Sequence, residues 1–159
     1  ERSRRPLATA LALHLYLQWL SNQLRLQYQG FWTHAVPSGF AQNPFCLRPV
    51  GPTGLAHPLI AALQTRPDGV LFVSDGAENY PARGVEWVLR QLKTETLPWL
   101  LHLNPVWNPV DYQPRELAAE VVTLGVRDIG TVPLLLHFGR FFRGGLDMPT
   151  LIAELEQTP

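Results

Sequence analysis

The chain has 159 residues, 46% of them apolar, and its 13 basic and 13 acidic side chains cancel. This length fits one domain with a sizeable core. The balanced charge removes the bulk electrostatic case for binding nucleic acid or an anionic membrane. The charged fraction of 16% is below the roughly 25% of an ordinary soluble domain, and a partner or a further segment that covers the surface is one explanation. The single Cys46 rules out an internal disulfide and fits a reducing, cytoplasmic location.

The first predicted element is a helix over residues 4–24. Ser3 is a candidate N-cap, and Pro6 is tolerated in the first turn of a helix. Leucines occur on all sides of this helix, which indicates that it is covered on most sides. The run carries no formal charge from residue 6 to 24, but polar side chains such as His14 and Gln18 favour a buried helix over a membrane span.

The next residues predict a strand pair and a turn. Residues 27–33 are rich in aromatic side chains and predict a strand, with Gly30 as a possible bulge. Residues 36–43 contain proline and glycine and predict a turn, and residues 45–47 predict a short peripheral strand. Residues 48–54 predict a loop, again because of their prolines and glycines.

The middle of the chain alternates between helices and apolar strands. Helices are predicted over residues 55–64 and 84–93. The continuous apolar run over residues 70–73 predicts a central parallel strand that is buried on both faces, and residues 99–103 predict a second buried strand; both end in polar residues.

Beyond residue 104 the pattern is less regular. Residues 104–114 hold three prolines and predict an extended loop, followed by a helix over residues 115–124. Residues 133–142 fit either a final strand or a helical turn, and residues 149–157 predict a closing amphipathic helix. The alternation of strands and helices predicts an α/β fold: a three-layer, doubly wound, mostly parallel sheet in a single domain over residues 1–159.

The loops at the carboxyl ends of the strands carry the candidate site, because ligands of open α/β sheets bind beyond those ends. The loop Gly51-Pro52-Thr53-Gly54-Leu55 precedes a helix, and the strand 70–73 runs into Ser74-Asp75-Gly76. In this order and spacing, the two segments resemble the second and third loops of the metal-ion-dependent adhesion site of von Willebrand factor A domains.

The resemblance implies a Rossmann-like fold of the von Willebrand A type and a site for Mg²⁺ or Mn²⁺ on Thr53 and Asp75. A hard cation takes oxygen ligands and keeps several waters, which leaves a position for a carboxylate from a partner. Each of the two residues can also be explained by a structural role that needs no cation. Thr53 fits a helix cap, and Asp75 fits a turn residue beside Gly76.

The sequence departs from the family at the first metal loop. No Asp-x-Ser-x-Ser sequence occurs in these 159 residues. We therefore expect that an upstream segment of the same protein carries the missing first strand and this loop; the alternative is a site that has decayed. Without that loop, cation binding is expected to be weak or absent.

The expected function is that of a non-enzymatic interaction module. Side chains at the rim of the site are candidates for partner binding: Glu78, Asn79, Tyr80, Asn104 and Trp107. Intracellular relatives of the resembled family serve as adaptors, so the resemblance implies a protein partner such as an AAA+ ATPase or another assembly subunit. No direct contact with nucleic acid or membrane is expected.

Two alternatives have different requirements. A purely structural module of the same fold would use no metal. A hydrolase would need a nucleophile or a zinc site, but the five histidines lack the i, i+4 spacing of a helical zinc pair. The chain also has no Gly-x-Ser-x-Gly, no Gly-x-Gly-x-x-Gly and no Walker A sequence, so a hydrolase is the more distant alternative.

Overall fold

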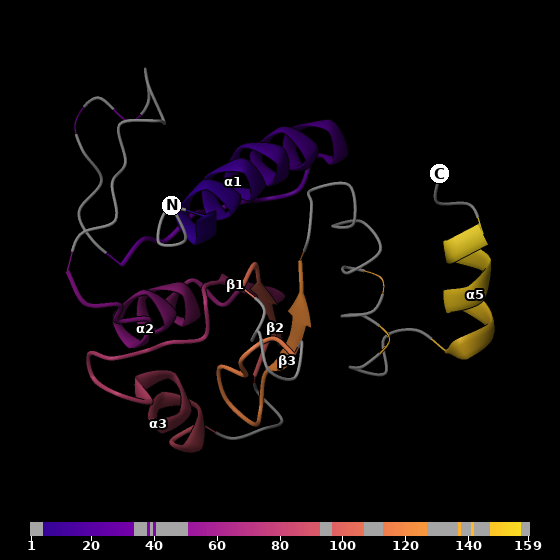
Figure 1. The fold of residues 1–159 in the computed structure, drawn as a ribbon. Coiled ribbons are helices and arrows are strands. Elements are labelled where there is room, and N and C mark those ends of the chain that lie inside the picture. Colours follow the sequence, from indigo (N-terminus) through magenta and orange to yellow (C-terminus); the bar gives the residue numbers. More distant parts are fainter. Residues whose placement is uncertain are drawn as a thin grey trace.

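A parallel three-stranded sheet forms the centre of the fold (Figure 1). The computed structural model describes residues 5–33, 38, 40, 51–92, 97–106, 113–126, 137, 141 and 147–156. The strands are β1 (Gly69–Val73), β2 (Trp99–Asn104) and β3 (Val122–Gly125), in the order β1-β2-β3. Together with the helices this makes a mixed α/β fold, as the sequence predicts.

The register of the sheet sorts its side chains into two faces. Leu71 pairs with Leu101, and Leu101 pairs with Val122. One residue further along, Phe72 lies beside His102. Because successive side chains of a strand point to opposite faces, these two rows face opposite ways.

Helix α1 (Arg5–Leu24) covers the face that carries Leu71. Leu13 of α1 is 1% exposed and packs in one cluster with Leu101 and Leu103, both fully buried. Figure 1 shows α1 lying along the sheet. The apolar character of α1 therefore has a structural reason on this side, whereas Trp19 on the same helix is 57% exposed.

Helices α2 (Ala56–Gln64) and α3 (Gly84–Arg90) pack with the opposite row of the sheet. Leu59 of α2 and Val85 of α3 are buried in one cluster with Phe72 of β1. Since α3 connects β1 to β2, these elements form a βαβ unit, the connection that parallel neighbours require.

Helix α5 (Met148–Glu156) follows near the end of the chain. Asp147 caps it: its carboxylate accepts a hydrogen bond from the Thr150 N–H at 2.8 Å. The pKa of Asp147 is lowered, first by a hydrogen bond with the Thr150 side chain and second by this backbone bond. The predicted helices over residues 4–24, 55–64, 84–93 and 149–157 thus correspond to α1, α2, α3 and α5, with ends shifted by a few residues.

The predicted strand over residues 27–33 is wrong. These residues form no strand, and their aromatic rings instead surround His14 of α1. The His14 Nδ1 lies 2.9 Å from the Tyr28 hydroxyl, and its ring centroid lies 5.2 Å from that of Trp32. Aromatic residues favour strands in general, but here their packing on a helix decides the local structure.

The predicted helix over residues 115–124 is also wrong. This stretch contains no helix, and its last three residues belong to strand β3. The β-branched Val121, Val122 and Thr123 favour a strand, and pairing with β2 supplies the hydrogen bonds. The predicted turn over 36–43, the strand over 45–47 and the alternatives for 133–142 lie wholly or largely outside the described residues.

Two further expectations concern β1 and the membrane. Within the described residues β1 pairs with β2 alone, so its predicted central position is not seen there. In the part of the chain that the structure describes, no helix is long and apolar enough to cross a membrane.

Candidate functional site

The predicted site lies where β1 and β2 end. Both strands are parallel, so their carboxyl ends meet at one edge of the sheet. Asp75 follows β1 by two residues, and Asn104 is the last residue of β2. This is the edge at which the sequence places the candidate site.

The loop that carries Thr53 is bonded to the loop that follows Asp75. The Thr53 carbonyl oxygen accepts hydrogen bonds from the N–H groups of Asn79 and Tyr80, each at 3.1 Å. In return, the Thr53 N–H donates to the Asn79 Oδ1 at 2.8 Å. A Cβ on Gly54 would lie 2.3 Å from the Tyr80 carbonyl oxygen, so this close approach requires glycine. The structure thus joins the Thr53 loop to residues 79 and 80, which follow the predicted Asp75 segment.

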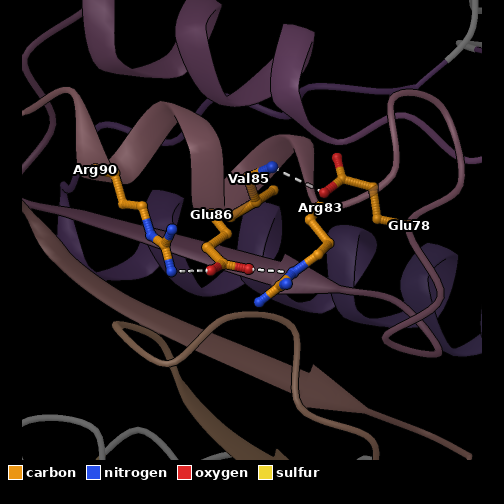
Figure 2. Close-up of polar contacts among 5 residues, drawn as sticks. All are labelled: Glu78, Arg83, Val85, Glu86 and Arg90. Atoms are coloured by element: carbon orange, nitrogen blue, oxygen red, sulfur yellow. Dashed lines mark hydrogen bonds and ion pairs between the residues drawn. The ribbon is translucent and has the colours of Figure 1, made fainter.

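Glu78 ties the same loops to two helices. Its Oε1 accepts hydrogen bonds from the N–H groups of Leu55 and Ala56, at 2.9 and 3.1 Å, at the start of α2. Its Oε2 accepts one from the Val85 N–H at 2.8 Å, in the first turn of α3 (Figure 2). Neither helix has a side-chain cap from its own N-cap residue, so the Glu78 carboxylate fills that role for both. The contact of Glu78 with a partner stays a prediction, and such a contact would compete with these hydrogen bonds.

Asp75 lies in a tight turn at the end of β1. Its Oδ1 accepts a hydrogen bond from the Ala77 N–H at 3.0 Å, as its reading as a turn residue expects. Gly76 has a φ of 72°, and a Cβ there would lie 2.5 Å from the Arg115 carbonyl oxygen. Glycine is therefore required next to Asp75.

The Thr53 hydroxyl and one oxygen of Asp75 keep free bonding capacity. Within the described residues the Thr53 hydroxyl makes no hydrogen bond, and neither does the second oxygen of the Asp75 carboxylate. In the same part of the chain, no three His, Cys, Asp or Glu side chains group closely enough to hold a metal ion. Any cation here would thus depend on a hydroxyl, one carboxylate and further ligands.

Asn104 is fully buried, although the sequence suggests a role at the rim. Its Nδ2 donates to the Arg115 carbonyl oxygen at 3.0 Å, and its Oδ1 accepts from the Val106 N–H at 2.8 Å. The side chain thereby fastens the loop after β2 to the segment before β3. Its predicted contact with a partner stays a prediction and would require this side chain to leave these bonds.

Among the described residues of the predicted rim, Asn79 and Tyr80 are exposed. The Tyr80 side chain is 71% exposed and lies beside the Thr53 loop. Trp107 lies outside the described residues. A surface hollow of about 420 Å³ near Leu63 and Pro98 lies at the other, amino edge of the sheet and takes no part in this arrangement.

Next to the candidate site lies a group of hydrogen-bonded polar side chains that the sequence analysis did not predict: Ser74, His102 and Thr123. The His102 Nε2 lies 2.9 Å from the Ser74 Oγ and 3.1 Å from the Ser74 carbonyl oxygen, and its Nδ1 lies 3.1 Å from the Thr123 Oγ1. His102 is fully buried, and Ser74 is 7% exposed. The signal in the sequence was a histidine within an apolar strand, but its partners depend on the sheet register.

The hydrogen bonds of His102 select one tautomer. A carbonyl oxygen can only accept, so the short contact to the Ser74 carbonyl requires a proton on Nε2, and Nδ1 then accepts from the Thr123 hydroxyl. Burial lowers the pKa of His102 to about 4, although the bond to the Ser74 backbone and the charge of Asp75 oppose this shift. The imidazole is therefore neutral at pH 7.

Comparisons of the chain with protein-family models, with curated proteins and with solved structures found no match.

Proposed function

We propose that this chain is a von Willebrand A-like interaction module that binds a carboxylate of a protein partner through a divalent cation. In this proposal Thr53 and Asp75 are two of the ligands of Mg²⁺ or Mn²⁺, and the fold is of the three-layer, doubly wound type. An Asp-x-Ser-x-Ser loop from elsewhere in the same protein would complete the ligand set. The partner would be a subunit of a larger assembly, such as an AAA+ ATPase.

One observation carries the proposal. The Thr53 loop is hydrogen bonded to the loop that follows Asp75, at the edge of the sheet where open α/β proteins bind ligands. The Thr53 hydroxyl and one Asp75 oxygen have no partner within the described residues. Mg²⁺ is commonly bound through one or two carboxylates and keeps several waters, so the Asp75 carboxylate and the Thr53 hydroxyl are compatible with such a site.

The proposed cation site predicts a specific loss when Asp75 is changed. In Asp75→Asn, the amide oxygen can still accept the Ala77 N–H, so the turn is kept while the charge is removed. Calorimetric titration of Mg²⁺ into the full protein should show affinity at least about tenfold weaker for this variant, a loss of about 1.4 kcal/mol.

Asp68→Asn provides the matched control, because Asp68 is an exposed aspartate before the other end of the same strand. We expect it to bind Mg²⁺ as the unchanged protein does. Equal heats for Asp75→Asn and the unchanged protein would remove Asp75 from the ligand set.

A structural module without a metal is the second candidate. It is favoured by the absence, within the described residues, of a group of three metal-ligating side chains. It is also favoured by Glu78 and Asn104, because their side chains are hydrogen bonded to backbone groups of this chain. If the titration gives no cation binding in the full protein, this candidate replaces the first.

The geometry of Ser74 argues against a role for this serine as a nucleophile. A serine nucleophile needs a neighbouring base that accepts its proton, as the histidine of a hydrolase does. Here the His102 Nε2 carries the proton, and the Gly76 N–H donates to the Ser74 Oγ at 3.1 Å. The pair is thus bonded as a structural link.

A further inference from the structure

Helix α3 has an exposed face that the proposed cation site does not use. Val85, Val88 and Leu89 pack inward and are at most 6% exposed. The outward side carries Arg83, Trp87 and Arg90, which we call the arginine–tryptophan stripe. Trp87 and Arg90 are three residues apart and lie on one side of α3. Arg83 is the residue that directly precedes the helix, and its side chain is also exposed.

Glu86 holds the two arginines of the stripe in place (Figure 2). Its carboxylate accepts from the Arg83 Nε with one oxygen and from the Arg90 Nη2 with the other. The Glu86 side chain is 10% exposed, whereas those of Arg83 and Arg90 are 78% and 65% exposed. The guanidinium groups are therefore fixed at one end and open to solvent at the other.

The stripe keeps an excess positive charge and unused donors. One carboxylate faces two guanidinium groups, which leaves a net charge of plus one. Each guanidinium has five N–H donors, and the bonds to Glu86 use a small part of them. The remaining donors suit carboxylates, which arginine binds in a planar, paired geometry.

Trp87 supplies an exposed apolar side chain next to Glu86 in the sequence. Its side chain is 65% exposed, although tryptophan is a large residue that gains from being covered. Tryptophan and arginine are also the residue types that contribute most often to binding hot spots. Arginines held by Glu86 lose less rotamer freedom on binding, which lowers the cost of an interface there.

We propose that the arginine–tryptophan stripe binds an acidic segment of a partner protein, with carboxylates on Arg83 and Arg90 and an apolar side chain on Trp87. Charge complementarity selects this occupant. The overall balance of 13 basic and 13 acidic residues gives no net positive charge that would attract a nucleic-acid backbone. This binding uses α3 alone and is independent of Thr53, Asp75 and any cation.

Fluorescence anisotropy tests the proposal with a defined probe. The probe is a short fluorescein-labelled peptide with glutamates on both sides of a central leucine, added to the full chain in EDTA. A peptide with glutamines in place of the glutamates is the control. We expect the acidic peptide to bind at least about tenfold more tightly than the glutamine peptide, and added salt to weaken it.

Three variants test the stripe itself. Arg83→Gln, Arg90→Gln and Trp87→Ala should each weaken binding of the acidic peptide, with about tenfold or more for Trp87→Ala. Arg66→Gln is the matched control, because Arg66 is an exposed arginine with a φ of 52°, close to the 59° of Arg83. It should bind as the unchanged protein does, and far-UV circular dichroism would verify that all variants fold.

The proposal is overturned if the unchanged protein does not bind the acidic peptide, or if all three variants bind it as the unchanged protein does. Tighter binding of a single-stranded RNA oligonucleotide than of the peptide would also overturn it. Loss of Mg²⁺ binding in Asp75→Asn would leave the result unchanged, so failure of the cation site and failure of the stripe are distinguishable.

Discussion

The imidazole of His102 is buried and neutral. It lies between Ser74, which directly follows β1, and Thr123 of β3. Its folded-state pKa of about 4 lies below the 6.5 of an unfolded histidine. The stability that this neutral group contributes is therefore complete above about pH 6.5 and is lost as the pH falls toward 4. From pH 7 to pH 5 the loss is on the order of 2 kcal/mol.

His102→Gln should remove most of this pH dependence, because glutamine does not titrate. Urea unfolding at both pH values would give the two free energies of unfolding. His14→Gln is the control: burial also lowers the pKa of His14, but its ring is partly exposed. Equal changes in unfolding free energy for His102→Gln and the unchanged protein would show that His102 is not buried neutral.

At this same scale, the sequence could propose residues of a candidate site but not their bonds. The loops of Thr53 and Asp75 follow from the rule that ligands bind beyond the carboxyl ends of parallel strands, and their choice as metal ligands follows from the resemblance. The bonds of Glu78 to the starts of α2 and α3 do not follow from it, because they link backbone groups 7 to 23 residues away. From the sequence alone, an acidic residue next to the candidate site is expected to be exposed, and only the folded loops reveal its backbone partners.

At the scale of elements, Glu78 couples the starts of α2 and α3. Glu78→Gln keeps one oxygen but replaces the other by an amide nitrogen, which cannot accept a hydrogen bond. One of the two helices then loses its cap, and we expect a loss of about 1–3 kcal/mol in the free energy of unfolding. Urea unfolding followed by circular dichroism measures this loss.

Glu116→Gln is the control for that change, since Glu116 is exposed and should alter stability little. If both variants unfold at the same urea concentration, the Glu78 bonds contribute nothing to stability. Glu78 would then be available for the partner contact that the sequence suggests.

The helices and strands with the clearest apolar patterns in the sequence were the ones that could be predicted. The helices α1, α2 and α3 and the strands β1 and β2 have long or continuous apolar patterns, and each was predicted. Residues 27–33 and 115–124 have mixed patterns in which propensity is weak. Their outcome depends on tertiary contacts, with His14 in the first case and with β2 in the second.

At the scale of the molecule, the described apolar residues that pack on the sheet form two clusters on its opposite faces. Leu13 anchors the cluster under α1, and Leu59 anchors the one under α2 and α3. A parallel arrangement could be predicted from the alternation of strands and helices, but the strand order could not, since it depends on which strands pair.

Because both clusters share β1 and β2, we expect the described sheet and its helices to unfold as one cooperative unit. Leu13→Ala and Leu59→Ala remove side chains that are each 1% exposed, and each should cost about 2–5 kcal/mol. Since the two side chains lie on opposite faces of the sheet, the double variant should show the sum within about 0.5 kcal/mol. Leu26→Ala, at a leucine that is 62% exposed, should change stability by less than about 0.5 kcal/mol.

Urea unfolding followed by tryptophan fluorescence and by circular dichroism should give coincident transitions for every variant. If Leu13→Ala separates the two transitions, α1 is a unit that unfolds independently of the sheet.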